Sequence, residues 1–410
     1  MVSVTKPKQS SPLARRTLAV CGGAHSLHDG FTDAIYVLLP IWSQALGLSL
    51  VQVGLLKSIT SAALAGFQLP AGFLSERFGA TVILALGTMV AGLGYILAGF
   101  AGGFVGLALA LAVVGAGAAV QHPLSSALVA DAYRDGGRRA ALGIYNFTGD
   151  VGKMLLPTSV AVGIGFIGWQ ESSMAVGALG LVGGVLIWVL LHRLALSVAA
   201  AKTAAAKGAT EPSKAEAPLR GWGIRDPLGF SLLSSIGLLD TATRYAFLPF
   251  LPFLLMEKGA AIESVGFAMT LVFAGGAVGK FACGLLAERL GIIRTVVLTE
   301  VLTAVGIIAL LTASLTAALI LLPLIGIALN GTSSVLYGTV SEFVDENRQA
   351  RAFSLFYTVG LASGAVSPVI FGAIGDAASV TVSLSLVAGM ALLIIGICPF
   401  LAPKIVEKSA

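Results

Sequence analysis

Charged and imidazole side chains occur inside the long apolar stretches of this 410-residue chain. A charge at the centre of a lipid bilayer costs about 2.5–3.5 kcal/mol on insertion scales, so such a group is usually paired or functional. Acids and histidines in these stretches can carry protons, and cations can hold an anionic ligand. The side chains are Asp29, Asp33, Lys57, Asp150, Lys153, Asp240, Arg244, Lys280, Glu300, His25, His28 and His122.

The first apolar stretch contains a stripe of titratable residues. His25, Asp29 and Asp33 are spaced at i, i+4 and i+8, which places them on one face of a helix. Asp29 falls about 20 Å along a helix that begins near Arg16, so we expect it near mid-membrane. A carboxylate removed from water takes up a proton more readily. We therefore expect proton coupling at Asp29, Asp33 and Asp240; the alternative is that a fixed cation neutralises Asp29.

Neighbouring acids and bases indicate a polar cavity for the substrate. Asp240 and Arg244 are one helical turn apart, and Asp150 and Lys153 are spaced i, i+3. Each pair could simply neutralise itself and fix helix packing, but buried ion pairs are costly, and two at similar depth favour a cavity. We expect substrate contacts from His25, His122, Asp150, Lys153, Arg244 and Lys57.

The remaining charges have simpler expected roles. Lys57 is expected to pair with an aspartate of the first helix, and Glu300 with Arg294. Lys280, near the end of its apolar stretch, is expected to extend to the membrane interface. His122 precedes a proline, so its alternative role is in a stabilised helix kink.

The composition is that of a membrane protein. Hydrophobic residues make up 57% of the chain and charged residues 11%, against roughly 25% charged in a soluble domain. A membrane-spanning helix needs about 20 apolar residues. The sequence predicts an all-α membrane protein with twelve transmembrane helices, at residues 17–42, 50–74, 80–101, 103–130, 141–166, 172–195, 227–255, 262–286, 291–313, 315–340, 352–374 and 379–402.

Lysine and arginine are distributed unequally between the two sides of these spans. Nearly all fall on the side of the two termini, whereas Lys258 falls on the other. Cytoplasmic loops carry the excess of these residues, so we expect a multi-pass protein of the inner cell membrane with both termini cytoplasmic. The net charge of +5 then faces anionic lipid, and no nucleic-acid partner is expected.

The two halves of the sequence repeat one another. Residues 72–79 match residues 284–291 at an offset of 212 (284 − 72), and Asp29 aligns with Asp240 at 211 (240 − 29). Nearly constant offsets in separate regions indicate duplication and parallel repeats. We predict two pseudo-symmetric six-helix bundles, at residues 1–195 and 225–410, joined by a cytoplasmic linker at residues 196–224.

The repeated loop reads G-x-L-x-E-R-x-G and resembles the hallmark loop of the major facilitator superfamily. Within that superfamily the chain resembles the fosmidomycin-resistance group of drug exporters, through residues 25–29 (His-Ser-Leu-His-Asp), 122–126 (His-Pro-Leu-Ser-Ser) and 149–152. The resemblance implies a central cavity lined by helices 1, 2, 4, 5, 7 and 8. The acids of the repeated loop could cap or pair at adjacent helix ends and so stabilise an outward-open state. The gating residues expected from this loop are Gly72, Glu76, Arg77, Glu288 and Arg289.

The leading function is proton-coupled efflux of a small drug-like molecule by alternating access. The alternative is transport of a small anionic metabolite held by cavity lysines and arginines; a non-transporting membrane receptor is a third possibility. The sequence contains no nucleotide-binding glycine loop, no nucleophile–base arrangement and no metal-ligand spacing of its cysteines. We therefore expect no enzyme activity, no cofactor and no metal site, in a monomer whose partners are the substrate, protons and lipid.

Overall fold

The computed structural model describes residues 11–134, 136–205, 223–345 and 349–405, and these form an all-α protein. Among them no strand forms, and Ile224 and Val344 make an isolated β-bridge. The helices are α1 Pro12–Leu46, α2 Leu50–Phe78, α3 Ala80–Gly99, α4 Phe104–Ala118, α5 Gln121–Ala132, α6 Arg138–Ala205, α7 Pro227–Glu257, α8 Ile262–Leu290, α9 Ile292–Thr312, α10 Leu315–Val340, η1 Ser341–Phe343, α11 Gln349–Ala377, α12 Val380–Leu401 and η3 Ala402–Lys404.

Two departures from the predicted spans have local causes. The predicted span 103–130 is present as one apolar segment, Phe104–Ala132, but it is interrupted between α4 and α5, because Pro123 has no N–H to offer the carbonyl four residues earlier. Conversely, α6 contains the two spans 141–166 and 172–195. Gly168 separates them with φ 84° and ψ 168°, a conformation that glycine adopts without strain.

Within the described residues, nine helices are long and apolar enough to cross a membrane. One of the nine, Ala140–Leu194, contains the break at Gly168. Helices α1 and α7 are not among the nine, and they carry Asp29 and Asp240. The all-α membrane fold is therefore confirmed, while the count of twelve spans stays a prediction.

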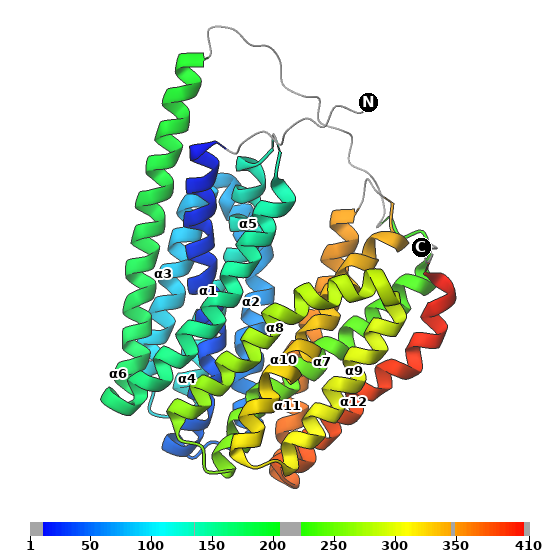
Figure 1. Ribbon diagram of the computed structural model, residues 1–410. Helices are drawn as coiled ribbons and strands as arrows, with labels where there is room; N and C mark the ends of the chain where they lie inside the picture. The colour runs from blue at the N-terminus through cyan, green and yellow to red at the C-terminus, as the bar shows by residue number, and fades with distance from the viewer. Residues whose placement is uncertain (1–10, 135, 206–222, 346–348, 406–410) are drawn as a thin grey trace.

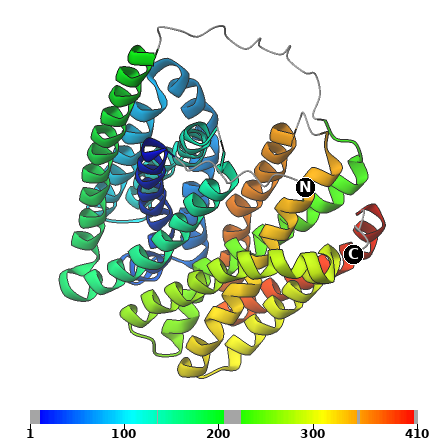
Figure 2. The ribbon, with the colours of Figure 1, turned by 45° about the horizontal axis from the view of Figure 1, so that its top comes forward.

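The helices gather into two groups that follow chain order. Figures 1 and 2 show α1–α6 on one side and α7–α12 on the other, with the start of α1 and the end of α12 toward one end of the molecule. We call that the proximal end, and the opposite end, with the α1–α2 and α7–α8 connections, the distal end. The predicted boundaries at residues 195/196 and 224/225 stay predictions, since most of the linker (206–222) lies outside the described residues, as do the basic residues before Ser11.

The two groups meet closely along α2 and α11. A Cβ atom at Gly54 would collide with the backbone of Pro368, and one at Gly372 with the backbone of Leu50. Glycine therefore allows these helices to touch backbone to backbone. The repeated loops also share one geometry: Gly79 and Gly291, 212 residues apart (291 − 79), have φ 88° and 86°.

Candidate transport site

Asp29 is the centre of a buried cluster of histidines. Its Oδ1 lies 2.8 Å from His28 Nδ1, 3.3 Å from His25 Nε2 and 3.8 Å from His122 Nε2. Asp29, His25 and His28 are buried in α1, whereas the His122 side chain from α5 is 48% exposed. The helical stripe predicted on α1 thus places His25 beside Asp29, and α5 contributes the third imidazole.

Helix α6 supplies the cation of this cluster. Lys153 Nζ lies 3.2 Å from Asp29 Oδ2, whereas the histidine nitrogens lie nearest to Oδ1. A Cβ atom at Gly149 would clash with Asp29 and His25, and one at Gly152 with the backbone of Ser26. These two glycines allow α6 to approach α1 closely enough for the ion pair. The alternative in which a fixed cation neutralises Asp29 matches this contact.

An alternating series of charges continues from this pair into the second half of the chain. Lys153 Nζ is 3.9 Å from Asp150 Oδ1, and Lys280 Nζ of α8 is 2.6 Å from the same oxygen. The expected Asp150–Lys153 pair therefore forms, but it is longer than the pair Lys153 makes with Asp29. Lys280 was expected to extend to the membrane interface. That expectation is wrong, because its ammonium group donates a hydrogen bond to Asp150.

A second acidic site lies in the other half. Asp240 Oδ2 is 3.7 Å from Arg244 Nη2, as the i, i+4 spacing predicted. The carboxyl group of Asp240 also lies close to that of Glu300 from α9. Both acids are buried, at 3% and 2% exposure. No ion pair joins Glu300 to Arg294 in the described part of the chain, so the expected partner of Glu300 was wrong.

Lys57 does not form the expected ion pair. Its ammonium group lies 3.4 Å from the carbonyl oxygen of Thr32 and 4.5 Å from the ring centroid of Tyr36. Within the described residues neither Lys57 nor Asp33 has an oppositely charged group within 4.0 Å. A cation–π contact with Tyr36, and a longer one of 5.6 Å with Tyr245, take the place of that pair.

The repeated loops lie exposed at the proximal end. Glu76, Arg77, Glu288 and Arg289 are exposed and Gly72 is partly exposed. No ion pair involves any of these residues in the described ranges, although Arg77 lies 5.3 Å from the ring of Phe78. Their gating role stays a prediction.

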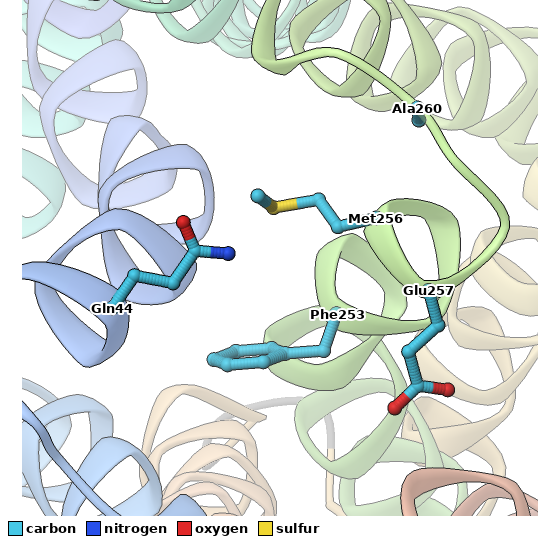
Figure 3. Close-up of a pocket in the computed structure, with 5 residues that line it drawn as sticks. All are labelled: Gln44, Phe253, Met256, Glu257 and Ala260. Carbon is cyan, nitrogen blue, oxygen red and sulfur yellow. The ribbon is translucent and has the colours of Figure 1, made fainter.

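The distal end is held by a contact between the two halves that the sequence analysis did not anticipate. Asp376, at the end of α11, accepts hydrogen bonds from Leu50 N (2.7 Å) and Val51 N (2.8 Å) at the start of α2. At the same end of the molecule is a pocket where α1 and α7 end, with Gln44 facing Phe253 and Met256 (Figure 3).

The structure also brings together three potential metal ligands that the sequence analysis did not group, while the expectation of no metal site stays a prediction. His25, Asp29 and His122 each offer a ligand atom, and the three atoms lie within 4.8 Å of one another. Their separation of almost a hundred residues in the sequence hid this arrangement. A signal was nevertheless present, because three of the four histidines occur in the motifs at residues 25–29 and 122–126.

The chain matches the family model of the Major Facilitator Superfamily over residues 22–229 and 233–409. The hexuronate transporter of Bacillus subtilis (strain 168) is 24% identical over 380 residues, which is 87% of this chain and 87% of that protein. The fosmidomycin resistance protein of Escherichia coli (strain K12) is 28% identical over 169 residues, 39% of this chain and 41% of that protein. A probable L-galactonate transporter of the same organism is 28% identical over 150 residues. That match covers about a third (33%) of its length and 37% of this chain.

Among solved structures, a bacterial homologue of the human lysosomal transporter Spinster, in an inward-facing and occupied conformation, has a TM-score of 0.80. It is 18% identical, and the match covers 97% of this chain and 98% of that chain. At this identity the likeness concerns the fold alone.

Proposed function

This chain belongs to the Major Facilitator Superfamily, and from that premise we propose that it couples proton movement to the transport of a small organic anion by alternating access. It is a multi-pass membrane transporter of small substrates, not an enzyme. The proposal places it in the inner membrane as a monomer with cytoplasmic termini, which the lysine and arginine distribution supports.

The observation that carries the proposal is the charge series Asp29–Lys153–Asp150–Lys280. It joins α1, α6 and α8, and so both halves, through distances of 3.2, 3.9 and 2.6 Å. A substrate carboxylate can compete with Asp150 for either lysine, because a carboxylate offers the same acceptor oxygens. Competition for Lys280 would break its ion pair with Asp150, which joins the two halves. Substrate binding would in this way be linked to movement of the halves.

The similar proteins support an anionic substrate. Two are named for hexuronate and L-galactonate, both carboxylates of sugar acids. Efflux of a drug-like molecule is the second candidate, which the similarity to the fosmidomycin resistance protein supports.

We assign the exchangeable proton to Asp240 and Glu300. Two adjacent buried carboxylates repel each other strongly, so we expect one of the two acids to hold a proton that it can donate to the other. Among the described residues Arg244 forms its ion pair with Asp240, at 3.7 Å, and none with Glu300. Asp29, by contrast, forms an ion pair with Lys153 at 3.2 Å, and this pair favours its ionised form. Asp33 remains a further candidate for the proton.

Transport by purified protein in liposomes tests the proposal. Galacturonate and L-galactonate would be added outside vesicles that contain a pH-sensitive dye, with neutral galactose as the matched control. We expect the two acids to change internal pH and galactose to have no effect. Lys153→Met should abolish the signal, while Lys258→Met, outside the charge series, should preserve it.

Two results would contradict the proposal. One is galactose transport as fast as that of the two acids. The other is no pH change from either acid together with proton-coupled movement of an uncharged, drug-like dye, which would favour the second candidate.

A further inference from the structure

Three of the four histidines of this chain meet at one carboxylate oxygen, Asp29 Oδ1. The fourth, His192, stacks on Trp188 at a ring-centroid distance of 5.6 Å, elsewhere on α6. The proton and substrate roles discussed above do not require three imidazoles at a single oxygen.

The hydrogen bond of His25 fixes which of its nitrogens is free. His25 Nδ1 lies 2.8 Å from the carbonyl oxygen of Tyr145, which can only accept, so Nδ1 carries the proton. In the neutral ring Nε2 is then a bare lone pair. It makes no hydrogen bond within the described residues, although the side chain is only 3% exposed. Nε2 instead points toward Asp29 Oδ1 at 3.3 Å, and that oxygen is also an acceptor.

Two facing acceptors are the arrangement that a bound cation satisfies. A histidine that binds a metal commonly donates its other N–H to a backbone carbonyl, as His25 does to Tyr145. Tetrahedral bonds of about 2.1 Å place neighbouring ligand atoms about 3.4 Å apart. The observed separations from Asp29 Oδ1 are 3.3 Å to His25 and 3.8 Å to His122, close to that spacing.

We propose that His25, Asp29 and His122 bind a divalent transition-metal ion of the Zn²⁺ class. Two imidazoles and one carboxylate favour such ions over Mg²⁺ and Ca²⁺, which prefer oxygen ligands alone. The half-exposed His122 offers a route for the ion, and the fourth coordination position stays open to water or to a carboxylate. Lys153 does not block the site, because it pairs with the other oxygen, Oδ2.

Direct binding of metal to the purified full-length protein tests this proposal without any transport assay. The protein would be in detergent, with any affinity tag removed because polyhistidine binds metal. Calorimetric titration with ZnCl₂ should give one saturable site, and MgCl₂ should give none. Co²⁺ should produce a visible absorption band that Zn²⁺ abolishes.

The variants His122→Gln and His25→Gln each remove a ligand, so each should weaken Zn²⁺ binding by at least the roughly 10–100-fold that loss of a residue supporting a ligand costs. His192→Gln is the matched control and should bind as the wild type does. His122 is half exposed, so its variant should fold even if His25→Gln does not. No saturable Zn²⁺ binding to the wild type would overturn the proposal, and so would wild-type affinity in folded His122→Gln. Neither result depends on the anion or proton proposals.

Discussion

Lys280 of α8 lies 2.6 Å from Asp150 of α6, and it is the one ion pair between the two halves in the described part of the chain. Lys280 is 37% exposed and Asp150 is 10% exposed. The pair is therefore accessible to a substrate from one side while it fixes the distance between the halves. A residue expected only to reach the membrane interface thus lies at a contact that the proposed alternating access would break.

The first prediction concerns this pair. Lys280→Met leaves Asp150 near Lys153 alone, so we expect a loss of about 1–2 kcal/mol of stability, modest because Lys280 is partly exposed. The double variant Asp150→Asn, Lys280→Met should recover that loss, because no charge is left unpaired, yet it should bind galacturonate more weakly, because one of the two lysines available to the substrate is gone. Thermal unfolding and calorimetric binding, measured on the same preparations, check both statements. If the double variant bound galacturonate as the wild type does, the Asp150–Lys280 pair would have a purely structural role.

The second prediction concerns the proton. Glu300→Gln retains size but cannot release a proton, so accumulation driven by a pH gradient should be lost. Exchange of labelled for unlabelled galacturonate across the membrane should continue, because it requires no net proton movement. Glu171→Gln, an exposed glutamate on α6, is the control and should behave as wild type.

The comparison with Asp29→Asn separates the two acidic sites. If the proton resides on Asp240 and Glu300, Asp29→Asn should weaken substrate binding through Lys153 without removing pH dependence. If Glu300→Gln retained gradient-driven accumulation and only Asp29→Asn lost it, the exchangeable proton would have to be assigned to Asp29 instead.

The third prediction concerns the contact at the distal end. Asp376→Asn replaces a carboxylate that accepts two backbone hydrogen bonds at a helix N-terminus, an interaction worth about 0.5–2 kcal/mol. We expect a shift of up to about 30-fold toward opening at the distal end. Gln44→Cys in the pocket of Figure 3 should then react faster with a polar maleimide, since Cys21, Cys283 and Cys398 are buried. Asp131→Asn, at the proximal end, should leave the rate unchanged.

Local patterns predicted what lies on one helix. The stripe of His25 and Asp29 and the pair of Asp240 and Arg244 follow from spacing of four residues, and the structure has both contacts. The repeated glycines at 79 and 291 follow from the duplicated loop. These features depend only on helix periodicity and backbone conformation, so the sequence contains them.

Contacts between helices could not be predicted in the same way. Lys280 and Asp150 are 130 residues apart, and which faces of α6 and α8 meet depends on close packing that one sequence does not specify. The expected pairing of Glu300 with Arg294 failed for the same reason, because the cation nearest to Glu300 in the sequence is not the group nearest to it in space. Lys57 shows that charge balance alone does not predict a partner. Its ammonium group contacts the ring of Tyr36 and not the carboxylate that was expected.

The last prediction concerns the repeated loops. Glu76 and Glu288 are exposed and make no ion pair among the described residues, while the halves are in contact at the distal end. If these acids stabilise the opposite, outward-open state, Glu76→Gln and Glu288→Gln remove a charge-assisted contact from the outward-open state alone. Both variants should then favour the state that is closed at the distal end. In the Gln44→Cys background, both variants should therefore react more slowly with the maleimide, opposite in sign to Asp376→Asn. Glu171→Gln is again the matched control. An unchanged or faster rate in both loop variants would show that the loops are simply solvated and that closure depends on the distal contact.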